Sequence, residues 1–258
     1  MVARADREQR LVFGEVAERY HLVRPAYPAA VVGRIADLAG PGGVVVEVGA
    51  GTGKLTVALL AHDLAVTALE PSSEMASVLR RTCPDASVVE VAFEEWAGPP
   101  AEAAVVAAGQ SWHWVRAEVR LDLAHRALRP GGAVALAWNR EQHAGPVGAA
   151  IDAAYRRHAP VGRPVTAPVA DGGGIEQGAA DELTADDRFD DVRVEEHHWP
   201  LTRPRDEYLD LMTTHSPHRM LDPAVHDRLL TAIGDAIDGH GGTIHLDVRT
   251  TLVTVRRR

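Results

Sequence analysis

The sequence predicts an α/β protein built on a doubly wound, mostly parallel sheet with helices on both faces. Short runs of Val, Ala and Leu alternate along the chain with longer stretches in which apolar residues recur at helical spacing. The short runs are apolar throughout, which is typical of strands that are buried on both faces. The chain has 258 residues, 46% of them hydrophobic, so its length suits one large domain or one domain with a lid.

Five strands and three helices are expected between residues 40 and 140, the first helix directly after the glycines, where Leu55, Ala58 and Leu59 recur at helical spacing. Ser72 or Ser73 can cap a helix that runs to Arg81, because Pro84 disfavours a helical conformation in the residue before it. A later helix, at about 117–128, ends in the sequence LRPGG, which is a helix stop followed by a turn. The expected strands are the apolar runs 44–48, 65–69, 87–91, 104–108 and 133–138.

The rest of the chain has another pattern. Residues 160–180 are rich in Pro, Gly and Ala without periodicity, and we expect a mobile loop there. Residues 192–201 and 243–257 alternate like strands with one solvated side, and two helices, near 204–213 and 223–238, are expected between them. An antiparallel pair of strands should therefore complete the parallel sheet.

Composition restricts the class of partner and the compartment. A formal net charge of −9, with only 27 Lys and Arg residues, gives no basic footprint for nucleic acid or an anionic membrane. The only cysteine is Cys83, so no intrachain disulfide can form and a reducing cytoplasm is the expected location. The charged N-terminal segment does not resemble a signal peptide, and no apolar run approaches the ~18 residues of a membrane span.

A glycine-rich turn follows the first expected strand, in the sequence VVVEVGAGTGKL of residues 44–55. A phosphate-binding P-loop is excluded, because Val48 replaces its first glycine and Leu55 replaces the hydroxyl residue that binds magnesium. A dinucleotide fingerprint is excluded as well, because Lys54 stands where the third glycine lets helix and strand approach closely. What remains is an acid followed by three alternate glycines.

A second acid, Glu70, lies 23 residues after Glu47, at the end of the second expected strand. Together with the glycine turn, it resembles the first motif of class I S-adenosylmethionine-dependent methyltransferases. The resemblance implies a Rossmann-like, mostly parallel seven-stranded sheet with an antiparallel last strand and a helical lid. It also implies S-adenosyl-L-methionine as cofactor and S-adenosyl-L-homocysteine as product. The turn residues that would pass under the methionine part of the cofactor are Glu47, Gly49, Ala50, Gly51 and Gly53.

In the family the acid that closes the second strand accepts hydrogen bonds from both ribose hydroxyls, a role that falls here on Glu70, with Pro71 beside it. Met75, on the following helix, would lie against the adenine, although core filling explains a methionine there equally well. At the end of the third strand the resemblance places adenine contacts at Ala92, Phe93 and Glu94. Many members carry an aspartate at what corresponds to Ala92, so backbone amides or Glu94 should serve instead.

The fourth strand ends in Gly109, Gln110 and the sequence SWHW, at the edge where open α/β sheets bind their ligands. This sequence departs from the Asn/Asp-Pro-Pro-Tyr loop of methyltransferases that act on amino groups of nucleic acid or protein glutamine. It resembles the loop of small-molecule enzymes, including those that esterify carboxylic acids. Trp114 would then donate its indole N–H to the acceptor, and His113 would steady the acceptor or remove a proton. Core packing of one indole and a backbone bond to His113 are the alternatives.

Further acceptor contacts are expected from this loop and from two other segments. Trp112 belongs to the same loop, Tyr20 and Arg24 lie in an N-terminal segment that resembles the family's lid, and His215 and His218 lie between the two late helices. Surface or helix-capping roles would explain the two histidines as well. No metal is expected, because the chain has neither a Cys pair nor an HExxH helix.

These expectations divide the chain into three regions: a cofactor-binding core with an N-terminal lid helix at 1–140, a lid or insert with the mobile loop at 141–185, and a segment at 186–258 that completes the sheet. The expected reaction is methyl transfer to a small molecule, a secondary metabolite or organic acid in a bacterium, with O-methylation favoured. The alternatives are N- or C-methylation, or a homologue that binds the cofactor and acts as a cyclase or regulator; protein or RNA methylation is disfavoured by the charge. A monomer or a homodimer is expected.

Overall fold

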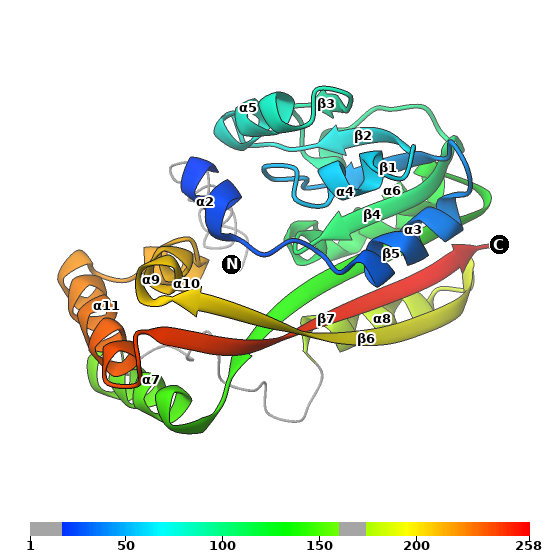
Figure 1. Ribbon diagram of the computed structural model, residues 1–258. Coiled ribbons are helices and arrows are strands. Elements are labelled where there is room, and N and C mark those ends of the chain that lie inside the picture. Colours follow the sequence, from blue (N-terminus) through cyan, green and yellow to red (C-terminus); the bar gives the residue numbers. More distant parts are fainter. Residues whose placement is uncertain (1–16, 160–173) are drawn as a thin grey trace. The chain divides into compact units, whose positions relative to one another are not determined.

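The structure is a computed structural model that describes residues 17–159 and 174–258 (Figure 1). The strands form one seven-stranded sheet in the order β3-β2-β1-β4-β5-β7-β6. The predicted fold class is therefore confirmed. The strands are β1 (Val44–Val48), β2 (Ala65–Leu69), β3 (Ser87–Val89), β4 (Ala103–Gly109), β5 (Leu128–His143), β6 (Phe189–Pro204) and β7 (Thr243–Arg257).

The first five strands of the sheet are parallel, and β7 runs in the opposite direction between β5 and β6. Val45 of β1 lies between Val66 of β2 and Val105 of β4, and β3 and β5 extend the parallel order on either side. Figure 1 shows β6 and β7 running in opposite directions, as expected for an antiparallel completion of the sheet. Buried apolar runs thus formed the parallel strands, and alternating runs formed the antiparallel ones.

The fifth strand is longer than predicted. We expected a turn at LRPGG and a strand over 133–138, but β5 already begins at Leu128, directly after helix α6 (Ala117–Ala127). Leu128 pairs with Ala103, and the pairing then shifts register between Ala103 and Val105. The Pro and Gly residues are therefore held as an irregularity at the start of the strand.

The chain divides into two compact units. The sheet unit contains Pro25–Asn139, Asp171–His197 and Thr250–Arg258, and the helical unit contains Met1–Arg24, Arg140–Ala170 and His198–Arg249. One of the boundaries that we expected, at residue 140, lies next to the division between Asn139 and Arg140, whereas the one at residue 185 lies inside the sheet unit. The long strands β5, β6 and β7 each contribute residues to both units.

In the sheet unit, alternate residues of the parallel strands enter two separate hydrophobic clusters, one on each face. Val45 and Val105 join the cluster formed with helices α3 (Ala29–Ala39), α4 (Thr56–Leu60) and α5 (Ser73–Thr82). Val46 and Val106 join the cluster on the opposite face, which the following elements cover: the 3₁₀ turns η2 (Phe93–Glu95) and η3 (Trp112–Trp114) and the helices α6 and α8 (Ile175–Ala185). The sheet is therefore covered on both sides, as predicted.

Helix α8 corrects one prediction. We expected residues 160–180 to be irregular, but a helix begins after Gly174 and buries Ala179, Ala180 and Leu183 against the sheet. Alanine is the best helix former, so the composition that suggested a loop also supports a helix once a sheet face is available. Residues 160–173 of the expected loop lie outside the described residues.

The helical unit has a core of its own. Its helices bury a cluster that includes Ile151, Leu211 and Ile233. The two late helices were predicted at almost the observed residues, and α2 lies in the segment where an N-terminal helix was expected, whereas the short helix between the late helices was not predicted. The helices are α2 (Ala17–Val23), α7 (Gly145–His158), α9 (Arg205–Thr213), α10 (Ser216–Arg219) and α11 (Pro223–Asp238).

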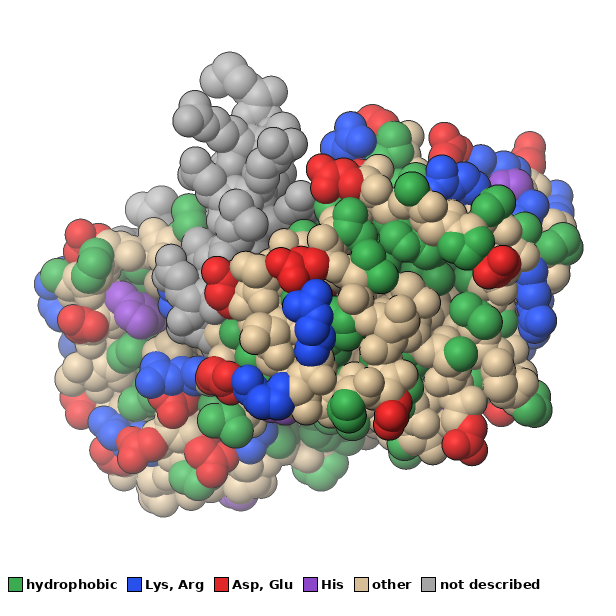
Figure 2. Space-filling view, turned by 90° about the horizontal axis from the view of Figure 1, so that it is seen from above, with side chains coloured by type: hydrophobic (Ala, Val, Ile, Leu, Met, Phe, Trp, Pro, Cys, Tyr) green, Lys and Arg blue, Asp and Glu red, His purple; other side chains and the backbone are tan. Residues whose placement is uncertain are grey.

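The surface carries mixed charge on the face that Figure 2 shows, where acidic and basic side chains are interspersed among the described residues. Among the helices that the structure describes, none is long and apolar enough to cross a membrane.

Candidate functional site

The three alternate glycines of the turn after β1 adopt positive φ angles for different reasons. A Cβ atom at Gly49 would lie 2.6 Å from Cβ of Ser111, and one at Gly53 would lie 2.7 Å from a side-chain carbon of Leu79. Both glycines are therefore required by packing inside the protein. A Cβ atom at Gly51, in contrast, would meet no atom within 4 Å. The backbone at Gly51 thus borders open space that a ligand can approach.

Glu70 lies next to this open space and is held by two backbone amides. The amide of Gly51 donates to Oε2 of Glu70 at 2.8 Å, and the amide of Ser72 donates to Oε1 at 2.8 Å. The residue is buried, with 7% of its surface exposed. Each carboxylate oxygen has a second lone pair, so the group can still accept hydrogen bonds from a ligand. The structure thus brings Glu70 and the glycine turn together, with Pro71 exposed beside them.

Glu47 is the second carboxyl group of the turn, and it is almost fully buried. The hydroxyl of Thr56 donates to its Oε2 at 2.7 Å. Burial raises the pKa of Glu47 from 4.5 to about 8; the hydrogen bond from Thr56 opposes this rise and the charge of Glu70 adds to it. The charged form of Glu47 is therefore costly in this structure.

The residues that we predicted to contact the adenine differ in their burial and in their hydrogen bonds. Met75 is buried on α5, where its backbone amide donates to the capping hydroxyl of Ser72, as expected from the sequence. Phe93 is also buried, and its ring lies 6.3 Å from that of Trp96. Glu94 accepts a hydrogen bond from the amide of Arg116 at 3.1 Å. Side-chain contact of Phe93 with a ligand does not fit this packing, which leaves the backbone from Ala92 onward.

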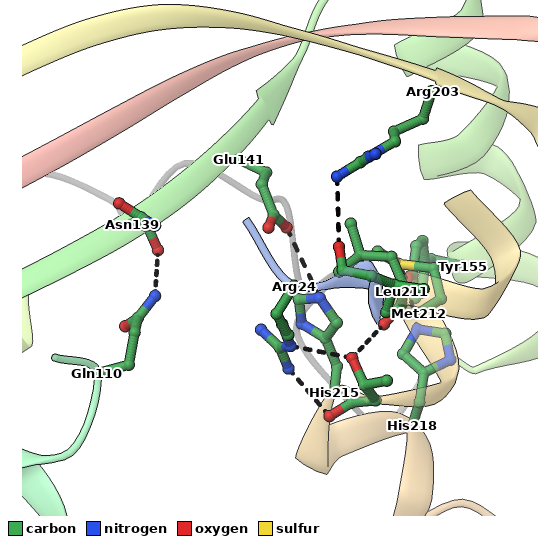
Figure 3. Close-up of polar contacts among 12 residues, drawn as sticks. Arg24, Gln110, Asn139, Glu141, Tyr155, Arg203, Leu211, Met212, His215 and His218 are labelled. Carbon is green, nitrogen blue, oxygen red and sulfur yellow. Dashed lines mark hydrogen bonds and ion pairs between the residues drawn. The ribbon is translucent and has the colours of Figure 1, made fainter. Parts of the chain in front are cut away.

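The loop after β4 is anchored by a strained residue. Gln110 has a φ of +61° although it is not glycine, a conformation that costs about 1–3 kcal/mol and is typical of functional sites. Its side-chain amide donates to the carbonyl of Asn139 at 2.8 Å (Figure 3). Gly109 precedes it, and a Cβ atom there would lie 2.4 Å from the hydroxyl of Tyr27. The hydroxyl of Thr250 holds Asn139 at its Oδ1, at 2.7 Å.

The three aromatic residues of this loop separate into a core residue and two partly exposed ones. Trp112 is fully buried and packs with the sheet core, so our prediction that it lines the acceptor site does not fit the structure. His113 and Trp114 are half-buried, with ring centroids 4.7 Å apart. The indole N–H of Trp138 donates to Nδ1 of His113 at 3.4 Å. His113 and Trp114 thus lie, partly exposed, in the loop that follows the fourth strand.

The remaining predicted residues lie in the helical unit, where Figure 3 shows their polar contacts. The guanidinium of Arg24 donates to the hydroxyl and to the carbonyl of Thr214, both at 2.9 Å, and lies 5.1 Å from the ring centroid of Tyr20. Nε2 of His215 lies 3.6 Å from a carboxyl oxygen of Glu141. This unit therefore brings together side chains from its first helix, its long strand and its late helices.

Two histidines of this cluster are held in the neutral form. Burial lowers the pKa of His218 to about 4, with His226 adding to the effect. Burial, then Arg24, lowers the pKa of His215, and burial raises the pKa of Glu141. The 3.6 Å contact between His215 and Glu141 would suit an ion pair, but both groups are disfavoured in their charged forms, so we regard it as a neutral contact.

His218 also has a partner that we did not predict. The hydroxyl of Tyr155 lies 2.7 Å from its Nε2. The pKa of Tyr155 is raised by burial, so the hydroxyl keeps its proton, and the sulfur of Met212 at 3.7 Å is the weaker acceptor. The hydrogen bond between Tyr155 and His218 is structural support for a buried imidazole.

Sequence reasoning missed Thr56, Ser111 and Asn139, which hold the predicted residues in place. Thr56 lies on one face of α4 and Asn139 near the end of β5, and neither belongs to a motif. Ser111 donates to the carbonyl of Val48, directly before the glycine turn. Its position between Gln110 and Trp112 was the only available signal. Among the residues that the structure describes, no group of three or more His, Cys, Asp and Glu could hold a metal ion.

Known proteins support the assignment of the sheet unit. Residues 45–132 match the methyltransferase domain family. An uncharacterized methyltransferase of Mycobacterium tuberculosis is 35% identical over 133 residues, which are 52% of this chain and 54% of that protein. The chain thus spans about half the length of the curated relatives that it matches.

Solved structures share the fold over nearly the whole chain. A protein of Anaeromyxobacter dehalogenans, provisionally described as a type II methyltransferase, has a TM-score of 0.68 at 21% identity, covering 91% of this chain and 97% of that chain. A phosphoethanolamine N-methyltransferase 2 of Haemonchus contortus, in complex with phosphomonomethylethanolamine and S-adenosylhomocysteine, has a TM-score of 0.53 at 15% identity, covering 95% and 57%. Residues 45–132, which contain the glycine turn and Glu70, are thus similar to a methyltransferase domain, and the solved structures share the fold of the chain.

Proposed function

We propose that the chain transfers a methyl group from S-adenosylmethionine to a small molecule, with the cofactor held by the sheet unit. The observation that carries this proposal is the arrangement around Gly51: its amide fixes the carboxylate of Glu70, while the space in front of its Cα is open. A pre-oriented carboxylate that still has lone pairs suits the two ribose hydroxyls. Gly49, Ala50 and Gly53 shape the backbone around that position.

The residues of the chain have only to bind and orient the reactants, because the cofactor supplies a methyl group already activated on a sulfonium. Alignment of nucleophile and methyl group can contribute several kcal/mol to the lowering of the barrier. His113 and Trp114, on the loop that Gln110 anchors, are our candidates for holding the acceptor. O-methylation of a secondary metabolite or organic acid is the favoured reaction.

Tyr20, Arg24, His215 and His218 remain predicted acceptor residues. What supports a role for Arg24 and His215 is their place in one buried polar cluster of the helical unit. The alternative function, cofactor binding without methyl transfer, uses the same glycine turn. A turnover assay distinguishes methyl transfer from cofactor binding alone, because only transfer releases S-adenosylhomocysteine.

The test combines calorimetry with a transfer assay. S-adenosylhomocysteine should bind and NAD should not, and Glu70→Ala should weaken the binding at least tenfold, since each hydrogen bond to a charged group contributes about 1.5–3 kcal/mol. Glu102→Ala, which removes an exposed carboxylate of the same unit, is the control and should leave the affinity unchanged. Binding of NAD without S-adenosylhomocysteine would overturn the proposal, and absence of S-adenosylhomocysteine release with a metabolite panel would favour the alternative.

A further inference from the structure

Asn139 is the only asparagine of the chain, and its side-chain amide binds two different segments. Nδ2 donates to the carbonyl of Ala26 at 3.1 Å, and Oδ1 accepts from the hydroxyl of Thr250 at 2.7 Å. A carbonyl oxygen can only accept a hydrogen bond, so the atom that faces Ala26 must be the nitrogen. The orientation of the amide is thereby fixed, and Thr250 is the donor in the second bond.

The main chain of Asn139 holds a third segment, the loop after β4. Its carbonyl accepts from the side-chain amide of Gln110 at 2.8 Å (Figure 3). Residues 25–27 also contact the end of β4 directly, because a Cβ atom at Gly109 would lie 2.4 Å from the hydroxyl of Tyr27. One residue of β5 is therefore bonded to residues 25–27, to β7 and to the loop.

These contacts lie where the chain enters or leaves the sheet unit. Pro25 and Thr250 each begin a stretch of that unit, and Asn139 ends one. Asn139 and Thr250 are also held by their strands, whereas Ala26 lies in the irregular segment between α2 and α3. The bond from Nδ2 thus attaches to the sheet a segment that has no strand of its own.

We propose that Asn139 is a positioning residue that joins residues 25–27 and the loop after β4 into one cooperative element. The bonds to Ala26 and Thr250 fix the place of the Asn139 carbonyl, and that carbonyl holds Gln110. Gln110 has a left-handed conformation, with a φ of +61°, which its surroundings have to maintain. Release of Ala26 therefore loosens the loop. The inference rests on the proposed function only for turnover, because this loop carries the candidate acceptor residues.

Aspartate is the substitution that separates the two side-chain bonds of Asn139. Asn139→Asp keeps the size of the side chain and can still accept from Thr250. It cannot donate to Ala26, and its charge repels that carbonyl. The main-chain carbonyl that binds Gln110 is retained. A change at the loop in this variant therefore reports the lost bond to Ala26.

Hydrogen exchange followed by NMR tests the coupling without any ligand. The amide of Gln110 donates to the carbonyl of Ala137 at 2.9 Å, so its exchange rate reports local opening of the loop. Asn139→Asp should raise this rate about 2- to 10-fold, as expected for the loss of one hydrogen bond. Gln177→Glu makes the same change of amide to carboxylate at an exposed residue of the sheet unit, and it should leave the rate unchanged. An unchanged rate in Asn139→Asp would overturn the proposal.

The reciprocal measurement leaves Asn139 in place and covers the case in which Asn139→Asp does not fold. Gln110→Glu removes the donor that faces the carbonyl of Asn139 and keeps the size of the side chain. Labelling with ¹⁵N-asparagine gives a single side-chain amide, the one that donates to Ala26. Since coupling is reciprocal, its protons should exchange faster in Gln110→Glu than in the wild type. Equal exchange in the two proteins would contradict the coupling.

Turnover distinguishes a positioning role from a general loss of stability. For any acceptor of the metabolite panel that the wild type methylates, Asn139→Asp should lower kcat/KM about 10-fold, because transfer is sensitive to small displacements of the reactants. The calorimetric affinity for S-adenosylhomocysteine should stay unchanged. An affinity that falls as much as kcat/KM would show a general structural role and refute the positioning role. If S-adenosylhomocysteine does not bind the wild type, the proposed function fails, and the exchange rates still decide the coupling.

Discussion

The substitution Glu47→Gln should remove a large pH dependence from the folding stability. Burial raises the pKa of Glu47 to about 8 in the folded chain, from 4.5 in its absence. The folded state therefore holds a proton that the unfolded state releases, and the free energy of unfolding falls as the pH rises through this interval. At about 1.4 kcal/mol for each pH unit, the fall approaches about 5 kcal/mol over the whole interval. Glutamine cannot ionise, so this fall is absent from the variant.

Urea denaturation at a series of pH values between about 5 and 9 measures the effect, without any ligand. The new amide can cost about 1–3 kcal/mol if its N–H group is unpaired, but that cost does not depend on pH. The slope, not the absolute stability, is therefore the quantity to compare. Glu102→Gln, at an exposed position, should follow the wild type. Parallel pH profiles for the wild type and Glu47→Gln would refute the reasoning.

Three further predictions follow from the burial and contacts of other residues. Gly51→Ala should abolish binding of S-adenosylhomocysteine but cost only about 1 kcal/mol of stability, whereas Gly53→Ala, whose Cβ atom would lie 2.7 Å from its nearest neighbour, should destabilise the fold by more than that in urea denaturation. Tyr155→Phe should cost about 1–3 kcal/mol, because the hydroxyl lies 2.7 Å from Nε2 of the buried His218, and a stability equal to that of the wild type would contradict this. Cys83 is buried and its thiol pKa is raised by that burial, so an aromatic disulfide reagent should react with the native chain far more slowly than with the urea-unfolded chain.

The parallel core could be predicted because its signals are local. Strands β1 and β2 begin and end at the predicted residues, since each is a short apolar run followed at once by a turn or an acid. The glycine turn and Glu70 were placed at one cofactor site by the resemblance, and the fold agrees, since adjacent parallel strands end at the same edge of the sheet. In the structure the two are in direct contact: the amide of Gly51 donates to the carboxylate of Glu70 at 2.8 Å.

The rest depended on contacts between distant residues. Trp112, His113 and Trp114 are consecutive, and no property of the sequence says which indole enters the core. Glu141 is a single acid at the end of an apolar strand, and its burial beside His215 arises from residues more than seventy positions apart. Helix α8 was missed for a related reason, because only the sheet beneath it distinguishes an alanine-rich helix from a loop.

The loop after β4 shows how this chain can present polar groups without a long motif. The amide of Gln110 donates to the carbonyl of Ala137 at 2.9 Å and its side chain to that of Asn139, both on β5, while Ser111 donates to the carbonyl of Val48 on β1. The loop is therefore attached to the strands on either side of β4, and the left-handed conformation of Gln110 is maintained by these bonds. A segment restrained at two successive residues has little freedom left to lose when a ligand binds. This pre-organisation is the physical reason for placing acceptor recognition at His113, directly after the two anchors.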